Sequence, residues 1–224
     1  AFPKPSVEGV TSVGSNIKAM FSPVFIFLFF AMALTAISEF GPQQWVGLIM
    51  SKSGASPMLI LALTTGVMAV GRFFAGPVVK ALGQTGVLLG GAIFASIGVF
   101  MFSTVTGPMA YVAALVFAIG VCYFWPVMVG AVAQRVPLSG ALGMSIIGGV
   151  GMFSTAIFQP IIGGWIDTAR ADQGAAGLAG DALELAAGQE TLQKMVMFPG
   201  ILIVLFIIFF IWQKGVKPAG EAAH

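Results

Sequence analysis

Six long apolar stretches constrain the fold of this chain more than any other feature. A helix needs about 20 mostly apolar residues to cross the hydrocarbon core of a bilayer. Of the 224 residues, 58% are hydrophobic and 8% are charged, which is too few polar side chains to cover a water-soluble globule. The sequence therefore predicts an all-α polytopic membrane protein with six transmembrane helices, at roughly 22–50, 57–79, 86–105, 108–133, 141–166 and 195–212.

The segments outside these stretches are short or polar. We expect residues 1–18 to be a cytoplasmic linker and 215–224 a cytoplasmic tail, flanking a six-helix domain at 19–214. Most connections are short enough to force antiparallel neighbours. The exception is 167–194, which is expected to be an outer loop and solvated spacer, with a second half whose Ala, Leu and Glu content suits a helix outside the bilayer.

Basic residues are distributed unevenly between the two sides of the predicted bundle. With the N-terminus inside, the inner ends carry Lys4, Lys18, Arg72, Lys80, Arg135, Lys214 and Lys217, and the outer ends carry Lys52, Arg170 and Lys194. Lys and Arg accumulate on the cytoplasmic side of membrane proteins. We therefore expect a multi-pass protein of a plasma membrane or bacterial inner membrane, surrounded by lipid, with both termini cytoplasmic.

Small residues recur one helical turn apart in several of the apolar stretches. Examples are Gly86 with Gly90, Ala92 with Ser96, and Ser145 with Gly149. Such pairs let two membrane helices approach closely. We expect these positions to mark helix crossings.

Glu39 is a carboxylate inside the first apolar stretch. It lies about 16 residues after Pro23 and about 13 before Lys52, which at 1.5 Å per residue places it in the outer half of the membrane. An ionised carboxylate is costly there unless it faces water or a partner, and taking up a proton removes that cost. Glu39 is therefore a candidate proton carrier and substrate contact.

A polar stripe and a predicted helix break surround Glu39. Thr35, Glu39 and Gln43 share one helix face, and Gly41-Pro42 is expected to break the helix where it lines a cavity. The alternative is a helix that ends at Ser38, with Glu39 at the outer surface and 43–50 as an interfacial loop.

Amide and aromatic side chains supply further candidate substrate contacts. The amides of Gln43, Gln44 and Gln159 could hydrogen-bond hydroxyl groups, and Trp45, Tyr123 and Trp125 could form apolar platforms. The alternative for the aromatic residues is packing or anchoring at the membrane interface.

Three motifs resemble the major facilitator superfamily. In GRFFAGPVVKALG, at 71–83, Gly76, Lys80 and Gly83 resemble the superfamily's loop signature, although Lys80 replaces its usual acidic residue and Gln84-Thr85 replace basic ones. GVCYFWPVMVGAVAQRVP, at 120–137, resembles the tenth helix, and GALGMSIIGGVGMFSTAIFQPIIGGWID, at 140–167, resembles the eleventh. Residues 18–214 thus resemble helices seven to twelve.

The spacing from Glu39 to Trp45, followed by GRFFAGP, is similar to the fucose/galactose/glucose:proton symporter family.

The resemblance implies one half of a major facilitator fold and secondary active transport. The expected solute is small and polar, with a sugar as the first candidate, moved with protons by alternating access. Arg72 and Lys80 would belong to a cytoplasmic gate. The expected partner is a second six-helix half, as a missing N-terminal half, a separate chain or a second copy. Efflux of amphipathic compounds, or a non-transporting membrane assembly or receptor subunit, remain alternatives.

The sequence gives no indication of an enzyme. The sole histidine is His224, no acid or histidine pair has metal-ligand spacing, and no phosphate-binding glycine loop follows a strand. No cofactor or metal is therefore expected. The sequence also lacks a basic patch for nucleic acid.

Overall fold

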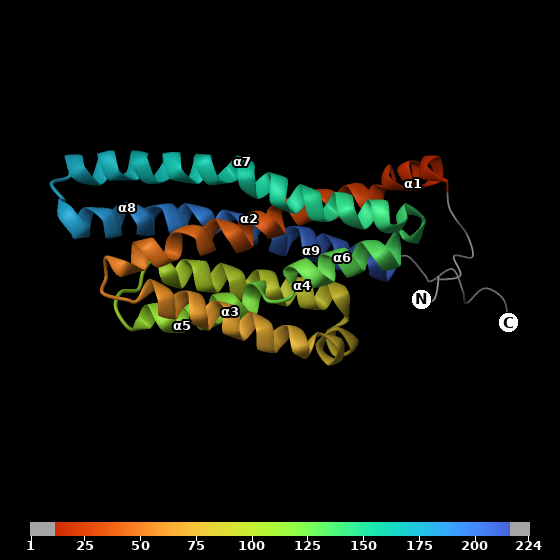
Figure 1. The fold of residues 1–224 in the computed structure, drawn as a ribbon, viewed down its shortest axis with the longest axis horizontal. Helices are drawn as coiled ribbons and strands as arrows, with labels where there is room; N and C mark the ends of the chain where they lie inside the picture. The colour runs from red at the N-terminus through yellow and green to blue at the C-terminus, as the bar shows by residue number, and fades with distance from the viewer. Residues whose placement is uncertain (1–11, 216–224) are drawn as a thin grey trace, which may run out of the picture.

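Helices account for all the regular structure in residues 12–215, the range described by the computed structural model. No strand occurs in that range, so the all-α prediction is confirmed. The helices run roughly along one common axis (Figure 1). The first residues of the predicted linker, 1–11, lie outside the described range, as do most of the predicted tail, 216–224, and His224. The rest of the predicted linker forms much of α1, Val13–Met20.

Within residues 12–215, five helical segments are long and apolar enough to cross a membrane. They are α2 (Pro23–Ser51), α4 (Ala75–Phe102), α5 with α6 (Met109–Val121 and Phe124–Arg135), α7 (Gly140–Ala175) with the preceding 3-10 turn (Pro137–Ser139), and α8 with α9 (Gly180–Met195 and Met197–Gly215). The sixth predicted crossing corresponds to α3, Pro57–Phe73, which is apolar but has 17 residues. The structure thus describes a multi-pass membrane protein.

Serine-proline pairs start two of these helices. The Ser22 Oγ accepts a hydrogen bond from the Phe25 N–H at 3.3 Å, and the Ser56 Oγ accepts one from the Leu59 N–H at 3.4 Å. The proline that follows each serine occupies the first helical position, where its missing N–H costs nothing. Both helix starts lie within two residues of the sequence predictions.

The predicted helix at 57–79 is divided in two. α3 ends before Phe74, and the chain turns again at Gly83, whose φ of 69° is readily adopted by glycine alone. Residues 75–82 therefore form a short helical piece that lies across one end of the bundle (Figure 1). Glycine has a conformational role here that a hydropathy pattern does not reveal.

The predicted outer loop at 167–194 is a helical hairpin. α7 continues for 36 residues to Ala175, and α8 begins at Gly180 (Figure 1). At 1.5 Å per residue α7 is about 54 Å long, against about 30 Å of bilayer hydrocarbon. Contacts that the sequence does not show hold the hairpin together: the Arg170 guanidinium donates to both Glu184 oxygens, and α7 packs against α8.

Glycine brings α4 and α5 into close contact, but at positions other than those predicted. A Cβ added at Gly98 would lie 2.5 Å from the Phe117 Cα, and one added at Gly91 would lie 2.6 Å from the Gly120 carbonyl oxygen. Gly90 and Gly149 have open space where their Cβ would lie. The predicted kind of contact is present, but its predicted positions at Gly90 and Gly149 are wrong. Successive residues of a helix point about 100° apart, so a glycine one position away faces a different neighbour.

Candidate functional site: a cavity halfway along the bundle

Glu39 lies near the centre of α2. The helix continues without interruption from Pro23 to Ser51, so Glu39 is about 24 Å from its start and about 18 Å from its end. The predicted break at Gly41-Pro42 is therefore wrong, as is the alternative of a helix ending at Ser38. Glu39 lies slightly nearer the Ser51 end of α2 than the Pro23 end, and its position relative to the two sides of the membrane stays a prediction.

Gly41 has a packing role in this uninterrupted helix. A Cβ at Gly41 would lie 2.9 Å from the Met195 Cε and 3.3 Å from the Ile162 Cδ1, so α7 and α8 approach α2 closely here. Pro42 has no N–H, which leaves the Ser38 carbonyl without its intrahelical donor. Membrane helices tolerate a proline when neighbouring helices pack around it. Packing of this kind explains why the helix does not break.

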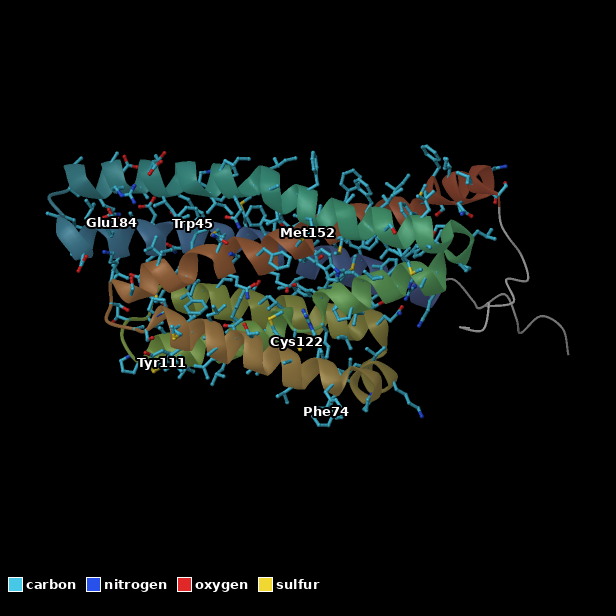
Figure 2. All side chains as sticks on the ribbon, in the orientation of Figure 1. Trp45, Phe74, Tyr111, Cys122, Met152 and Glu184 are labelled. Carbon is cyan, nitrogen blue, oxygen red and sulfur yellow. The ribbon has the colours of Figure 1, made fainter. Side chains whose placement is uncertain are left out.

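A cavity of about 470 Å³ opens between α2, α3, α6 and α7. Its lining residues are Glu39, Phe40 and Gln43 of α2, Thr65, Met68, Ala69 and Arg72 of α3, Trp125 of α6, and Met152 of α7. Figure 2 shows Met152 and, across the bundle, Cys122 about halfway along the molecule. The cavity thus lies about halfway along the bundle.

The cavity contains some predicted residues and some that the sequence reasoning missed. Glu39, Gln43, Arg72 and Trp125 were candidates, whereas Phe40, Thr65, Met68, Ala69 and Met152 were not. The position of Arg72 in the sequence would have been enough to identify the missed residues of α3. Residues three, four and seven positions before it, namely Ala69, Met68 and Thr65, share its helix face.

Glu39 and Arg72 form a loose ion pair at the cavity wall. The Arg72 Nη2 lies 3.6 Å from the Glu39 Oε1, and the Glu39 side chain is 2% exposed, while that of Arg72 is 42% exposed. The other carboxylate oxygen, Oε2, is buried and has no hydrogen-bond partner among the described residues. A buried carboxylate with one long contact is far from satisfied.

A proline-induced break in the α5–α6 helix holds Arg72 in place. Pro126 lacks the N–H that would reach the Cys122 carbonyl one turn earlier, and the Arg72 Nε donates to that oxygen at 3.0 Å. A reciprocal bond runs from the Tyr123 hydroxyl to the Gly71 carbonyl at 2.7 Å. The two bonds fix α3 against the break and orient the guanidinium toward Glu39.

Tyr123 therefore contacts backbone and is not among the cavity-lining residues. Lys80 is exposed on α4 and is likewise absent from the lining, so the structure does not bring it together with Arg72. The Arg72 side chain lies on the cavity, next to Glu39, rather than beside Lys80.

Trp45 and Gln159 bond to each other instead of lining the cavity. The Trp45 indole N–H donates to the Gln159 Oε1 at 2.8 Å, and the Gln159 Nε2 donates to the Phe40 carbonyl at 3.0 Å. These bonds join α2 to α7 beside Pro42 and Pro160, where each helix contains a proline. Gln44 is exposed and is absent from the cavity lining.

Comparison with known proteins finds no matching family model, no matching curated protein and no matching solved structure. Within the described part of the chain, no group of three or more His, Cys, Asp or Glu side chains is arranged to hold a metal ion.

Proposed function

We propose that this chain is one half of a major facilitator transporter that moves a small polar solute together with protons by alternating access. The observation that carries this proposal is the Glu39–Arg72 pair, in which a nearly fully buried carboxylate borders a cavity in the middle of a membrane bundle. The resemblance of residues 18–214 to helices seven to twelve of the superfamily supports the same reading.

The carboxylate of Glu39 is suited to carrying a proton. Removing a charge from water costs several kcal/mol unless a partner and further hydrogen bonds compensate it. Arg72 compensates Glu39 only in part, because the contact is 3.6 Å long and Oε2 has no partner in the described structure. A proton arriving through the cavity would neutralise the carboxylate, and its departure would restore the pair.

Exposed helix faces on both sides of the cavity favour a second helical bundle as the partner. α3 buries only Ile60, Thr64 and Met68, and the apolar window of α7 is the least buried of the five candidate spans. Both helices contribute to the cavity wall. A second six-helix half placed against them would close the cavity and complete the solute site.

The cavity is less suited to a sugar than the sequence led us to expect. Of the three glutamines considered as sugar contacts, Gln43 alone lines it, since Gln159 is bonded to Trp45 and Gln44 is exposed. The remaining polar side chains of the wall are Glu39, Thr65 and Arg72. A neutral monosaccharide therefore stays one of the solutes to test rather than the assumed one.

Uptake by proteoliposomes containing the full-length protein tests the proposal. An inward proton gradient should drive accumulation of at least one labelled solute from a panel of galactose, fucose and lactate. The Glu39→Gln variant should lose this accumulation while still exchanging solute across the membrane, because the amide cannot ionise. Asp172→Asn, which changes an exposed acid near the outer end of α7, is the matched control.

Two results would contradict the proposal. Gradient-driven accumulation that is unchanged in Glu39→Gln would make Glu39 a structural residue. Expulsion of an amphipathic dye, without uptake of any polar solute in the panel, would favour efflux.

A further inference from the structure

The guanidinium of Arg72 has an edge that the protein leaves open. Its Nε is bonded to the Cys122 carbonyl, and its Nη2 is too far from Glu39, at 3.6 Å, for a normal hydrogen bond. No bond from Nη1 to another described residue is present, and the side chain is 42% exposed at the cavity wall. Two N–H groups on one edge of an arginine match the two oxygens of a carboxylate.

The remaining cavity wall is mainly apolar. Phe40 and Trp125 meet edge to face, with ring centroids 5.9 Å apart, and Met68, Ala69 and Met152 add aliphatic and thioether surface. Gln43 and Thr65 supply an amide and a hydroxyl. A ligand that fits this wall has an anionic end for Arg72 and an apolar or aromatic body with few hydroxyl groups.

We propose that the cavity binds a small organic carboxylate through Arg72, and that binding of the anion drives a proton onto Glu39. The inference deepens the proposed function, on which its transport consequence rests, by naming the solute class and the coupling step. The binding step itself does not depend on transport.

Charge balance in the cavity links the two events. In the empty cavity, Glu39 and Arg72 carry opposite charges and sum to zero. When the ligand carboxylate takes the open edge of Arg72, two negative groups face one positive group, and the buried Glu39 carboxylate accepts one proton from water. The loaded cavity again sums to zero, so one anion and one proton cross together without net charge.

Few other ionisable groups face Glu39. The Cys122 thiol and the Tyr123 hydroxyl lie at the α5–α6 break behind Arg72, and the Tyr123 hydroxyl is already donating to the Gly71 carbonyl. The wall residues from α6 and α7, Trp125 and Met152, carry no ionisable group. Glu39 is thus the acceptor for the proton that accompanies the anion.

Calorimetric titration of the full-length protein in detergent, with benzoate as the probe, tests the binding step. Benzamide, of the same shape but neutral, is the matched ligand control. Benzoate should bind at least about tenfold more tightly than benzamide, as expected for a charge-assisted, two-point contact. Comparing buffers of different ionisation enthalpy at alkaline pH should show one proton taken up per benzoate.

Three variants separate the roles of the two residues. Arg72→Gln should weaken benzoate binding at least about tenfold, and Arg72→Lys, which keeps the charge and loses the fork, should restore part of it. Glu39→Gln should keep benzoate binding and lose the proton uptake. Lys18→Gln, which removes an exposed cation on α1, should behave as the unmodified protein. Equal binding of benzamide, absence of benzoate binding, or binding without proton uptake would each overturn the inference.

A flux measurement distinguishes failure of this inference from failure of the proposed function. Lactate accumulation in proteoliposomes should follow the pH gradient and ignore a potassium-valinomycin potential, with protein-free liposomes as background. Accumulation of galactose without any lactate flux overturns the inference and keeps the transport proposal. Benzoate binding with proton uptake, but no flux of any solute, keeps the inference and overturns transport. Absence of both overturns both.

Discussion

Arg72 and Arg170 are almost equally exposed, but the guanidinium of Arg170 is fully engaged by acidic partners and that of Arg72 is not. Their side chains are 42% and 40% exposed, respectively. Arg170 donates to both oxygens of Glu184, at 2.7 and 2.8 Å, and to Asp167 at 2.7 Å. Arg72 has one backbone acceptor at 3.0 Å and a carboxylate at 3.6 Å. The N–H groups of Arg170 are therefore bonded to residues of the hairpin, whereas Arg72 retains N–H groups that can bind a ligand in the cavity.

The contrast between these two arginines indicates which ion pairs to associate with function. The hairpin network lies on exposed or half-buried side chains with short contacts; it consists of Lys52–Asp181, Arg170 with Asp167 and Glu184, and Lys194–Glu190. Exposed pairs of this kind contribute little to stability. The Glu39–Arg72 pair joins a carboxylate that is 2% exposed to a partner that does not satisfy it. A pair of this kind can change its partners.

The largest expected contrast is between Arg72→Gln and Arg170→Gln. Removing Arg72 leaves a buried carboxylate without its cation, which costs about 3–5 kcal/mol or forces Glu39 to stay protonated. We expect loss of proton-driven accumulation and a clear fall in thermal stability in detergent. Arg170→Gln should change the free energy of unfolding by about 1 kcal/mol or less and leave flux intact. Equal effects of the two variants on flux and thermal stability would show that Arg72 and Arg170 have the same role.

Replacing Pro126 by alanine tests whether the helix break at Cys122 holds the Arg72 side chain in position. Pro126→Ala restores an N–H that competes with Arg72 for the Cys122 carbonyl, so the guanidinium loses a fixed position. We expect about fivefold weaker benzoate binding, corresponding to roughly one hydrogen bond of about 1 kcal/mol. Pro160→Ala in α7 makes the same chemical change away from Arg72. If Pro160→Ala weakens binding as strongly, the effect is a general one of helix straightening.

The Trp45–Gln159 bond is expected to act on stability rather than on binding. Trp45→Phe leaves the part-buried Gln159 Oε1 without its donor, at a cost of about 1–2 kcal/mol in the free energy of unfolding. Trp165→Phe, whose ring stacks on Phe198 with centroids 6.1 Å apart, keeps its stacking surface and is the control. A loss of benzoate affinity in Trp45→Phe, at unchanged stability, would place Trp45 in the ligand site instead.

The smallest expected effect is the difference in salt dependence between the hairpin ion pairs and the Glu39–Arg72 pair. Lys52→Gln removes the exposed bond to Asp181, with an expected cost of about 0.5 kcal/mol or less. That cost should vanish in about 1 M salt, where the screening length falls to about 3 Å. The effect of Arg72→Gln should persist at the same salt concentration, because Glu39 is buried. Thermal unfolding at two ionic strengths measures both.

Much of the fold follows from local sequence, and the exceptions depend on distant contacts. Apolar length and the Ser-Pro pairs place the starts of α2 and α3, because these signals act within one helix turn. The kink inside α4 depends on the conformation of Gly83, and the hairpin of α7 and α8 depends on Arg170 meeting Glu184. Neither the conformation nor the contact leaves a hydropathy signal.

The candidate site divides in the same way. Glu39, Gln43 and Arg72 could be selected because polar groups are unusual inside a membrane segment. Trp125 could be selected because it lies in the middle of its segment, away from the interface where tryptophan usually serves as an anchor. The pairing of Glu39 with Arg72 joins α2 to α3, so it could not be predicted from the pattern within either helix. Trp45 and Gln159 were indistinguishable from ligand contacts, because an internal partner satisfies a buried amide as well as a substrate does.

The long α7 also acts as a lever. From Pro160, the residue at which this helix is most easily bent, to its end at Ala175 is about 22 Å, so a 10° swing would move the tip by about 4 Å. The tip is exposed and lies away from the cavity, at the far end of the bundle (Figure 1). A spectroscopic label at Asp172 would therefore report bending of α7 at Pro160, magnified and without touching the cavity.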